Sequence, residues 1–244
     1  MKPSTDSRNP AEPEKMKNRG KAPVPREHGA WFVLFGSVLV GTAAAGRMGE
    51  ELLLFASSVF FLFLAREPLS KLLRIRLRPA PRDREKRWKQ WLAVELLLAT
   101  LTGLPLLLVY RRWELLWFAG LGIGMFAIHL WWAERRLDRT LTAQLLGMVG
   151  LTAAAPAAVT ALRQADSGLL LTVWMICSLY FASGVFYVRM RVAAAVKPAR
   201  WPQNRALCLG YHLLLAIAVS VLSLIHISEP TRPLYISYAV FCLK

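Results

Sequence analysis

The chain alternates between long apolar runs and short segments that are rich in charge. A helix needs about 20 mainly apolar residues to cross the roughly 30 Å of hydrocarbon in a bilayer. Soluble proteins rarely contain such runs, because a helix at their surface carries a polar stripe. The pattern therefore predicts an all-α, polytopic transmembrane helical bundle of about seven spans within residues 26–221. The spans are expected at residues 29–46, 52–65, 91–110, 115–133, 140–162, 168–188 and 205–221.

The composition agrees with a membrane protein and excludes three other classes. Hydrophobic residues make up 55% and charged residues 19% of the chain, and the mean hydropathy is +0.38. Such a chain is too apolar to stay disordered, and 15 Gly and three Cys in 244 residues exclude a collagen-like repeat and a disulfide scaffold. The formal net charge of +16 is unusual for so apolar a chain, and its meaning depends on where the charges lie.

The basic residues separate cleanly between the two sides that seven spans define. With the N-terminus on the cytoplasmic side, the cytoplasmic segments before residue 222 hold 25 Lys and Arg residues, and the outer loops hold four. Lys and Arg concentrate in the cytoplasmic loops of membrane proteins. We therefore predict a multi-pass protein of the bacterial inner (plasma) membrane with a cytoplasmic N-terminus, and we interpret the excess positive charge as a topology signal.

The two ends of the chain differ from the spans between them. Residues 1–25 are rich in Pro, Ser, Lys and Glu and lack an apolar period, which predicts a disordered cytoplasmic tail. Residues 222–232 and 236–243 resemble the translations of two sequencing-library adapters, at the spacing those adapters have. We therefore interpret residues 222–244 as adapter read-through and expect the natural chain to be cut off inside or just after the seventh span.

The segment 66–90 is the most charged part of the chain, with ten Lys and Arg residues. Within it, leucines share one helical face while Lys71, Arg74 and Arg78 fall on another. This pattern predicts a short amphipathic helix in the membrane interface, with these three side chains contacting anionic phospholipid headgroups. Basic clusters also bind nucleic acid, but the position beside a span favours lipid, and we expect no nucleic-acid partner.

A compact motif, REHGAW at residues 26–31, stands at the start of the first apolar run. It resembles the start of the first span in the YwiC-like family of bacterial membrane proteins, and FYVRMR at residues 186–191 is a weaker match. The resemblance extends over about residues 24–221. It implies a multi-pass membrane protein, but it implies almost no chemistry, because the family is functionally uncharacterised.

Glu27 and His28 lie at the cytoplasmic start of the first span, and two interpretations of them stay open. Glu27 fits a capping charge, because the helix dipole favours a carboxylate at a helix N-terminus. Alternatively, His28 belongs to a polar site at the membrane face, where Gly29 allows a close backbone approach.

Glu95 is the only acidic residue well inside an apolar run. An ionisable group within a membrane is costly and is a functional candidate by default. The alternative is that Glu95 lies near the interface, reaches water and pairs with Lys89 or Gln90. The sequence leaves both interpretations open.

Glu134 and Asp138 are four residues apart and share one helix face at the cytoplasmic end of the fourth span. Two carboxylates so placed suit Mg²⁺, which takes oxygen ligands. Three neighbouring arginines make local ion pairing the simpler explanation. We therefore expect no bound metal and no cofactor.

The predicted topology brings a set of polar residues to the cytoplasmic side, namely His28, Arg66, Glu67, Glu134, Asp138 and Arg189. Prenyl-diphosphate transferases of the membrane use such a face, but the repeated Asp-rich motifs that they need are absent. We therefore favour a non-enzymatic role, as a small-solute carrier or an accessory membrane subunit, with an unidentified small-molecule or lipid ligand. The alternative is an intramembrane enzyme acting on an anionic amphipathic, lipid-diphosphate-like substrate at this face.

Overall fold

The computed structural model describes residues 28–77, 82–135, 137, 140–196 and 198–228 of the chain. The predictions for the tail 1–25, for Glu27, Arg78 and Asp138, and for residues 229–244 lie outside the described residues. So do those for the side chains of His28, Arg74 and residues 222–228.

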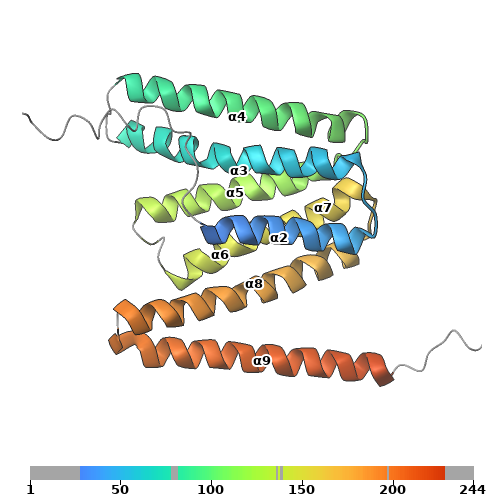
Figure 1. The fold of residues 1–244 in the computed structure, drawn as a ribbon, viewed down its shortest axis with the longest axis vertical. Helices are drawn as coiled ribbons and strands as arrows, with labels where there is room; N and C mark the ends of the chain where they lie inside the picture. Colours follow the sequence, from blue (N-terminus) through green and yellow to red (C-terminus); the bar gives the residue numbers. More distant parts are fainter. Residues whose placement is uncertain (1–27, 78–81, 136, 138–139, 197, 229–244) are drawn as a thin grey trace, which may run out of the picture.

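The described residues form helices and no strand, so the predicted all-α helical bundle is confirmed. Six helical segments are long and apolar enough to cross a membrane, and the seventh, Gly29–Ala45, is shorter. Figure 1 shows the helices running back and forth between two ends of the molecule. In chain order they are α2 (His28–Ala45), α3 (Glu50–Leu77), α4 (Arg82–Leu108), α5 (Leu115–Glu134), α6 (Leu141–Thr152), α7 (Ala154–Leu162), α8 (Ser167–Val196), the short 3₁₀ helix η1 (Pro198–Arg200) and α9 (Trp201–Ser228).

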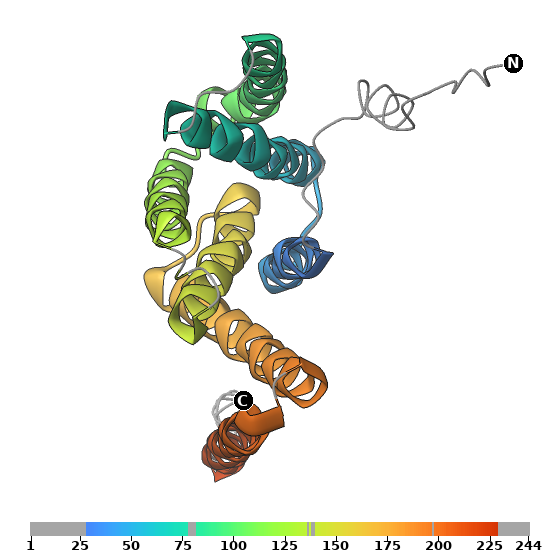
Figure 2. The same cartoon turned by 90° about the vertical axis from the view of Figure 1, so that its left-hand side faces the viewer.

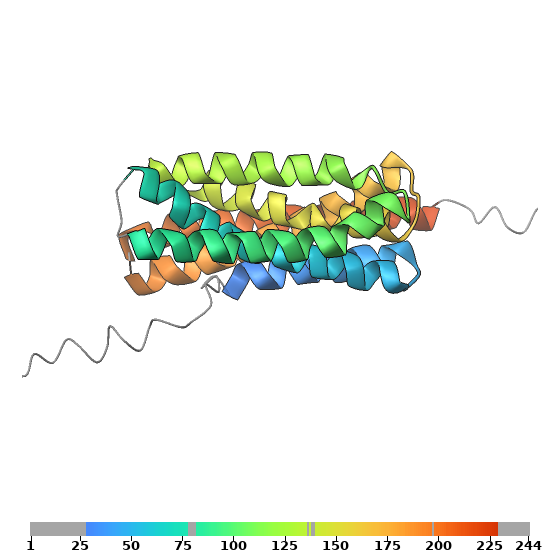
Figure 3. The ribbon, with the colours of Figure 1, turned by 90° about the horizontal axis from the view of Figure 1, so that it is seen from above.

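The bundle is an elongated array with a core and two flanking hairpins. Seen end-on, α4 lies at one edge and α9 at the other, with α2, α6 and α7 between them (Figure 2). Helix α3 packs mainly against α4, helix α8 against α9, and α2 against α7. The axes of these helices are roughly aligned, while the chain direction alternates from one span to the next (Figure 3). The core is therefore α2 with α6 and α7, and each hairpin contributes one helix that contacts it.

The fifth span is interrupted at Ala153, where α6 ends and α7 begins. Pro156 explains the break, because it has no N–H to donate to the carbonyl of Thr152 and its ring crowds that turn. The Thr152 hydroxyl donates to the carbonyl of Val149 at 2.9 Å and lies 2.8 Å from the Ser178 hydroxyl of α8. Every residue from Ala155 to Leu162 is buried, so the break lies inside the protein.

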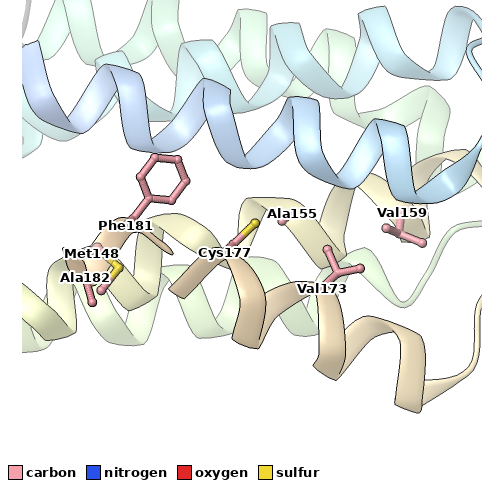
Figure 4. Packing of buried hydrophobic residues seen from close by; sticks show 7 residues of the cluster. All are labelled: Met148, Ala155, Val159, Val173, Cys177, Phe181 and Ala182. Atoms are coloured by element: carbon pink, nitrogen blue, oxygen red, sulfur yellow. The ribbon is translucent and has the colours of Figure 1, made fainter. Parts of the chain in front are cut away.

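Small residues allow α2 to approach α7 very closely. A side chain at Gly41 would place its Cβ 2.1 Å from the carbonyl oxygen of Ala155 and 2.9 Å from the Cβ of Ala158. Next to this contact, Phe181 of α8 points toward α2 and reaches the position of Gly36, within a cluster of buried apolar side chains (Figure 4). Helices in lipid associate through such van der Waals contact rather than through the hydrophobic effect.

The segment expected to form a separate interfacial helix is instead the end of α3. Helix α3 continues through Pro68, which is buried, to Leu77. Its 28 residues span about 42 Å at about 1.5 Å per residue, which exceeds the roughly 30 Å of hydrocarbon. Residues 66–77 therefore continue α3, and residues 82–90 begin α4, instead of forming a separate helix.

The substitution Gly41→Ala tests the α2–α7 contact. The added methyl group meets backbone atoms that cannot rotate away, so we expect the free energy of unfolding to fall by about 1–3 kcal/mol. Steric trapping or denaturant titration in micelles measures this change. Gly122→Ala in α5 is the matched control, because nothing lies within 4 Å of its Cβ position; a loss as large as that of Gly41→Ala would refute the proposed role of the contact.

Candidate functional site

The alternation of helices gathers the predicted polar residues at one end of the bundle, here called the basic end. It comprises the starts of α2, α4, α6 and α9 and the ends of α3, α5 and α8 (Figure 1). The other end, here called the opposite end, comprises the ends of α2, α4, α7 and α9 and the starts of α3, α5 and α8. Arg66, Glu67, Glu134 and Arg189 all lie toward the basic end, as the topology predicts.

At the basic end, aromatic rings connect the start of α2 to Arg66. Trp31 packs edge-on against Phe63 of α3, with ring centroids 4.6 Å apart, and against Phe60 at 5.6 Å. The guanidinium of Arg66 lies over the Phe63 ring at 5.2 Å from its centroid. Trp31, the last residue of the REHGAW motif, is thus packed beside Arg66.

The other candidates at the basic end have local partners. Glu67 pairs with Lys71 at 3.4 Å, one helical turn further on. Arg189 of α8 donates to the side-chain oxygen of Gln144 in α6 at 3.0 Å. Glu134 is exposed at the end of α5. In the end-on view, α3 and α8 lie on either side of α2 and α6.

The structure therefore brings the start of α2 and Arg66 together and places Arg189 with Gln144. A single cluster that includes His28 and Asp138 stays a prediction. Among the residues that the structure describes, no group of three or more His, Cys, Asp or Glu side chains is suited to hold a metal ion.

Glu95 is the central residue of the 27-residue helix α4, and its side chain is buried, with 5% of the residue exposed. Lys89, one of its expected partners, pairs instead with Glu85 at 2.7 Å. Within the described part of the chain, no hydrogen-bond partner meets the Oε2 atom of Glu95. An acid deep in a membrane-spanning helix therefore keeps one carboxyl oxygen unsatisfied.

Helices α3 and α4 contact each other between Glu95 and the opposite end of the bundle. One turn beyond Glu95, the Ser58 hydroxyl of α3 donates to the carbonyl of Ala99 at 3.1 Å. Further toward the opposite end, Phe55 and Leu106 are buried in one apolar cluster that also includes α2 and α7 residues. This apolar layer closes the bundle between Glu95 and the opposite end.

The opposite end has an ordered polar group that sequence reasoning missed. Arg47 pairs with Glu51 at 2.8 Å, and the Tyr110 hydroxyl donates to the Glu50 carboxylate across the α3–α4 pair. An Nη atom of Arg112 donates to the carbonyl of Leu162 at the end of α7, at 3.3 Å. The sequence indicates only that four arginines lie between the spans on this side, and nothing in their spacing indicates these contacts.

A hollow of about 360 Å³ opens beside this group. Arg112, Glu114, Thr160, Gln164, Ala165 and Leu170 line it. The Nε atoms of Arg112 and Arg163 are buried, and no described residue supplies either with a hydrogen-bond partner. Thr160, which lies in the hollow's wall, is itself buried.

Comparison with known proteins places the chain in a family. Residues 24–159, more than half of the chain, match the family model described as YwiC-like protein. The chain belongs to the YwiC-like family. It is 25% identical over 203 residues to "Uncharacterized protein YwiC" of Bacillus subtilis (strain 168), an alignment covering 80% of this chain and 76% of the relative. No solved structure matches the chain.

This family match confirms the assignment that the REHGAW motif suggested. The matched region of this YwiC-like protein runs from just before α2 into α7. It includes Trp31, Arg66, Glu95 and Arg112, and it ends just before Thr160 in the wall of the hollow. Together with the apolar helices, the match identifies a multi-pass membrane protein of the YwiC-like family.

Tyr110 offers a test of the polar group at the opposite end. Its hydrogen bond to Glu50, followed by partial burial and the charges of Glu50 and Glu51, raises the pKa of the phenol from 10.0 to about 12. The protonated phenol is favoured in the folded state, so this interaction is fully present below pH 10 and is lost as the pH rises through about 12.

The titration of Tyr110 is measured as the difference in tyrosinate absorbance between the unmodified protein and Tyr110→Phe. We expect this difference to titrate near pH 12, and Glu50→Gln to shift it toward pH 10 because the acceptor charge is removed. A difference that titrates near pH 10 in the unmodified protein would show that the hydrogen bond does not form.

Proposed function

We propose that this protein is a small-solute carrier in which Glu95 binds either the solute or a proton that moves with it. The buried, incompletely partnered carboxyl group of Glu95 carries the proposal. A carboxyl group inside a membrane is costly unless it is paired, and such residues mark ion, proton and substrate pathways. A partner that arrives and leaves explains why the described residues leave one oxygen of this group unsatisfied.

The interrupted span α6–α7 supports the same function. Carriers often form their binding sites from discontinuous helices, because a broken helix exposes backbone groups within the membrane. Here the break is buried at the centre of the bundle, beside the hydroxyl groups of Thr152 and Ser178. Two more buried hydroxyl residues, Ser37 and Thr42, lie on α2, the helix that packs against α7.

The apolar layer at Phe55 and Leu106 fits a carrier in a closed conformation. A carrier must never be open to both sides at once, so one side of the binding group has to be sealed. Helix α3 contacts α4 far more extensively than it contacts α7, which favours movement of the α3–α4 hairpin as a unit. In this proposal, the hairpin rocks against α2 and α7 and exposes Glu95 to each side in turn.

The charge distribution supports a particular orientation for the carrier. We propose that the basic end faces the cytoplasm of a bacterial cell and that the protein resides in the inner membrane, following the positive-inside rule. Lys71 lies near the end of α3, and we propose that it contacts anionic headgroups together with Arg74 and Arg78, which follow it in the sequence. Each such contact contributes about 1 kcal/mol to membrane attachment.

The carrier proposal is tested by reconstituting the purified protein into proteoliposomes on a solid-supported membrane. The probes are pools of amino acids, organic acids, sugars and monovalent cations, each applied with and without a pH step. We expect a transient current from at least one pool, and we expect Glu95→Gln to reduce it to the level of empty liposomes. The amide keeps the shape of the side chain but can neither carry charge nor exchange a proton.

Glu85→Gln is the matched control, because Glu85 lies on the same helix outside the apolar segment and pairs with Lys89. It should retain the current. A folded, reconstituted protein that yields no current with any pool would refute the carrier proposal. A Glu95→Gln variant with an undiminished current would refute the role of Glu95.

A further inference from the structure

The hollow at the opposite end has the size and chemistry of a small-molecule site. It is bounded by the α4–α5 turn, the end of α7 and the α7–α8 turn, all at one end of the bundle (Figure 1). Its volume of about 360 Å³ falls within the range of about 300–1,000 Å³ typical of ligand sites. The site shares no residue with the surroundings of Glu95, so it goes beyond the carrier proposal.

Arg112 supplies the anion-binding group of this hollow. Its guanidinium is fixed by donation to the carbonyl of Leu162 at 3.3 Å, so its orientation is set before any ligand arrives. The dipole of α7 favours a cation at this C-terminus, which explains why an arginine is tolerated here. The Nε atom of Arg112 is buried, and no described residue provides a hydrogen-bond acceptor for it. Because this Nε atom is enclosed, we assign anion binding to the terminal nitrogens of the guanidinium, which pair with carboxylate or phosphate oxygens.

Arg163 adds a second guanidinium next to the hollow. It directly follows the last residue of α7 and precedes Gln164, which lines the hollow. Its backbone N–H is already used, because it donates to the carbonyl of Val159 at 2.9 Å. Its buried Nε atom, like that of Arg112, lacks an acceptor within the described residues. The region therefore has more donor capacity than the described chain satisfies.

Glu114 adds a negatively charged side chain to the lining of the hollow, which also contains the positively charged Arg112. It occupies the N-cap position of α5, yet its side chain makes no capping hydrogen bond there. Its carboxylate is exposed in the lining of the hollow. The lining thus combines Arg112, Glu114 and Gln164 with the apolar side chains of Ala165 and Leu170. The Thr160 hydroxyl is already used, because it donates to the carbonyl of Pro156 at 3.0 Å. A simple anion meets repulsion from Glu114, and a simple cation meets repulsion from Arg112.

We propose that this hollow binds a small zwitterion, with its anionic oxygens on Arg112 and its ammonium group on Glu114. Two sources present this chemistry at a membrane surface. One is a soluble molecule such as a free amino acid, and the other is the phosphoethanolamine headgroup of a phospholipid.

The binding test uses the full chain, purified into nanodiscs of phosphatidylglycerol, with glycine and glycerophosphoethanolamine as zwitterionic probes. Acetate and ethylamine supply each charge alone. Calorimetric titration should give at least one zwitterion an affinity about tenfold or more above those of acetate and ethylamine, because only the zwitterion satisfies both charged groups. Zwitterions that bind no better than acetate would overturn the proposal.

Two substitutions assign the binding to the hollow. Arg112→Gln should weaken zwitterion binding at least about tenfold, since it leaves the bound anionic group unpaired. Arg111→Gln is the matched control, because it removes the same charge from an adjacent, exposed residue outside the lining. Equal affinities of these two variants would overturn the proposal.

Glu114→Gln provides an independent measurement should Arg112→Gln fail to fold. It should lower the affinity for zwitterions toward that for acetate without lowering the affinity for acetate itself. An unchanged preference for zwitterions would overturn the role of Glu114 and with it the proposal.

Nanodiscs that contain phosphatidylethanolamine separate the two sources. If the headgroup is the ligand, soluble zwitterions bind more weakly in these discs, and native mass spectrometry finds the lipid retained by the unmodified protein and lost from Arg112→Gln. If a soluble zwitterion is the ligand, its affinity is the same in both discs. Each result supports the site and identifies whether its ligand is a lipid headgroup or a soluble molecule. Binding is measured at equilibrium without transport, so it is independent of the currents that test Glu95.

Discussion

The close approach of α2 to α7 at Gly41 is the contact on which the rest of the bundle depends. Apolar surfaces gain little by leaving lipid for protein, so helices in a membrane are held by the fit of their surfaces. Because Gly41 has no side chain, the α2 backbone comes to rest against the Ala155 carbonyl. Helix α7 is buried around this contact, and α3, α5 and α8 all pack against it. The contact between α2 and α7 is thus built from small residues, and larger buried side chains such as Phe181 pack around it.

The same close packing surrounds the break in the fifth span. The break at Ala153 leaves a helix with fewer backbone hydrogen bonds, and it is tolerated because neighbouring hydroxyl groups and packed helices surround it. Glu95 lies outside this core, in the α3–α4 hairpin, which contacts the core through fewer residues than it contacts itself. This arrangement, a closely packed centre and a peripheral hairpin that holds Glu95, is the basis of the alternating access that we propose.

The two ends of the bundle differ in the number of basic residues but not in the kinds of contact that charged residues make. Each end has pairs between residues four apart in the sequence, such as Glu67 with Lys71 at the basic end and Arg47 with Glu51 at the opposite end. Exposed pairs such as the first of these contribute little stability, about 0.3–0.5 kcal/mol. Each end also has contacts between elements, from Arg189 to Gln144 at the basic end and from Arg112 to Leu162 at the opposite end.

The sequence by itself determined the helical membrane class, the positions of the apolar helices and the gathering of basic residues at one end, because apolar run length and charge position are local properties. It also singled out Glu95, since an acid inside an apolar run is visible without a structure. Only the tertiary structure decided that Glu95 is buried away from Lys89 and that α3 continues through Pro68. It alone joined Arg112, Glu114 and Thr160 around one hollow, because they come from separate loops and helices whose packing no local pattern encodes.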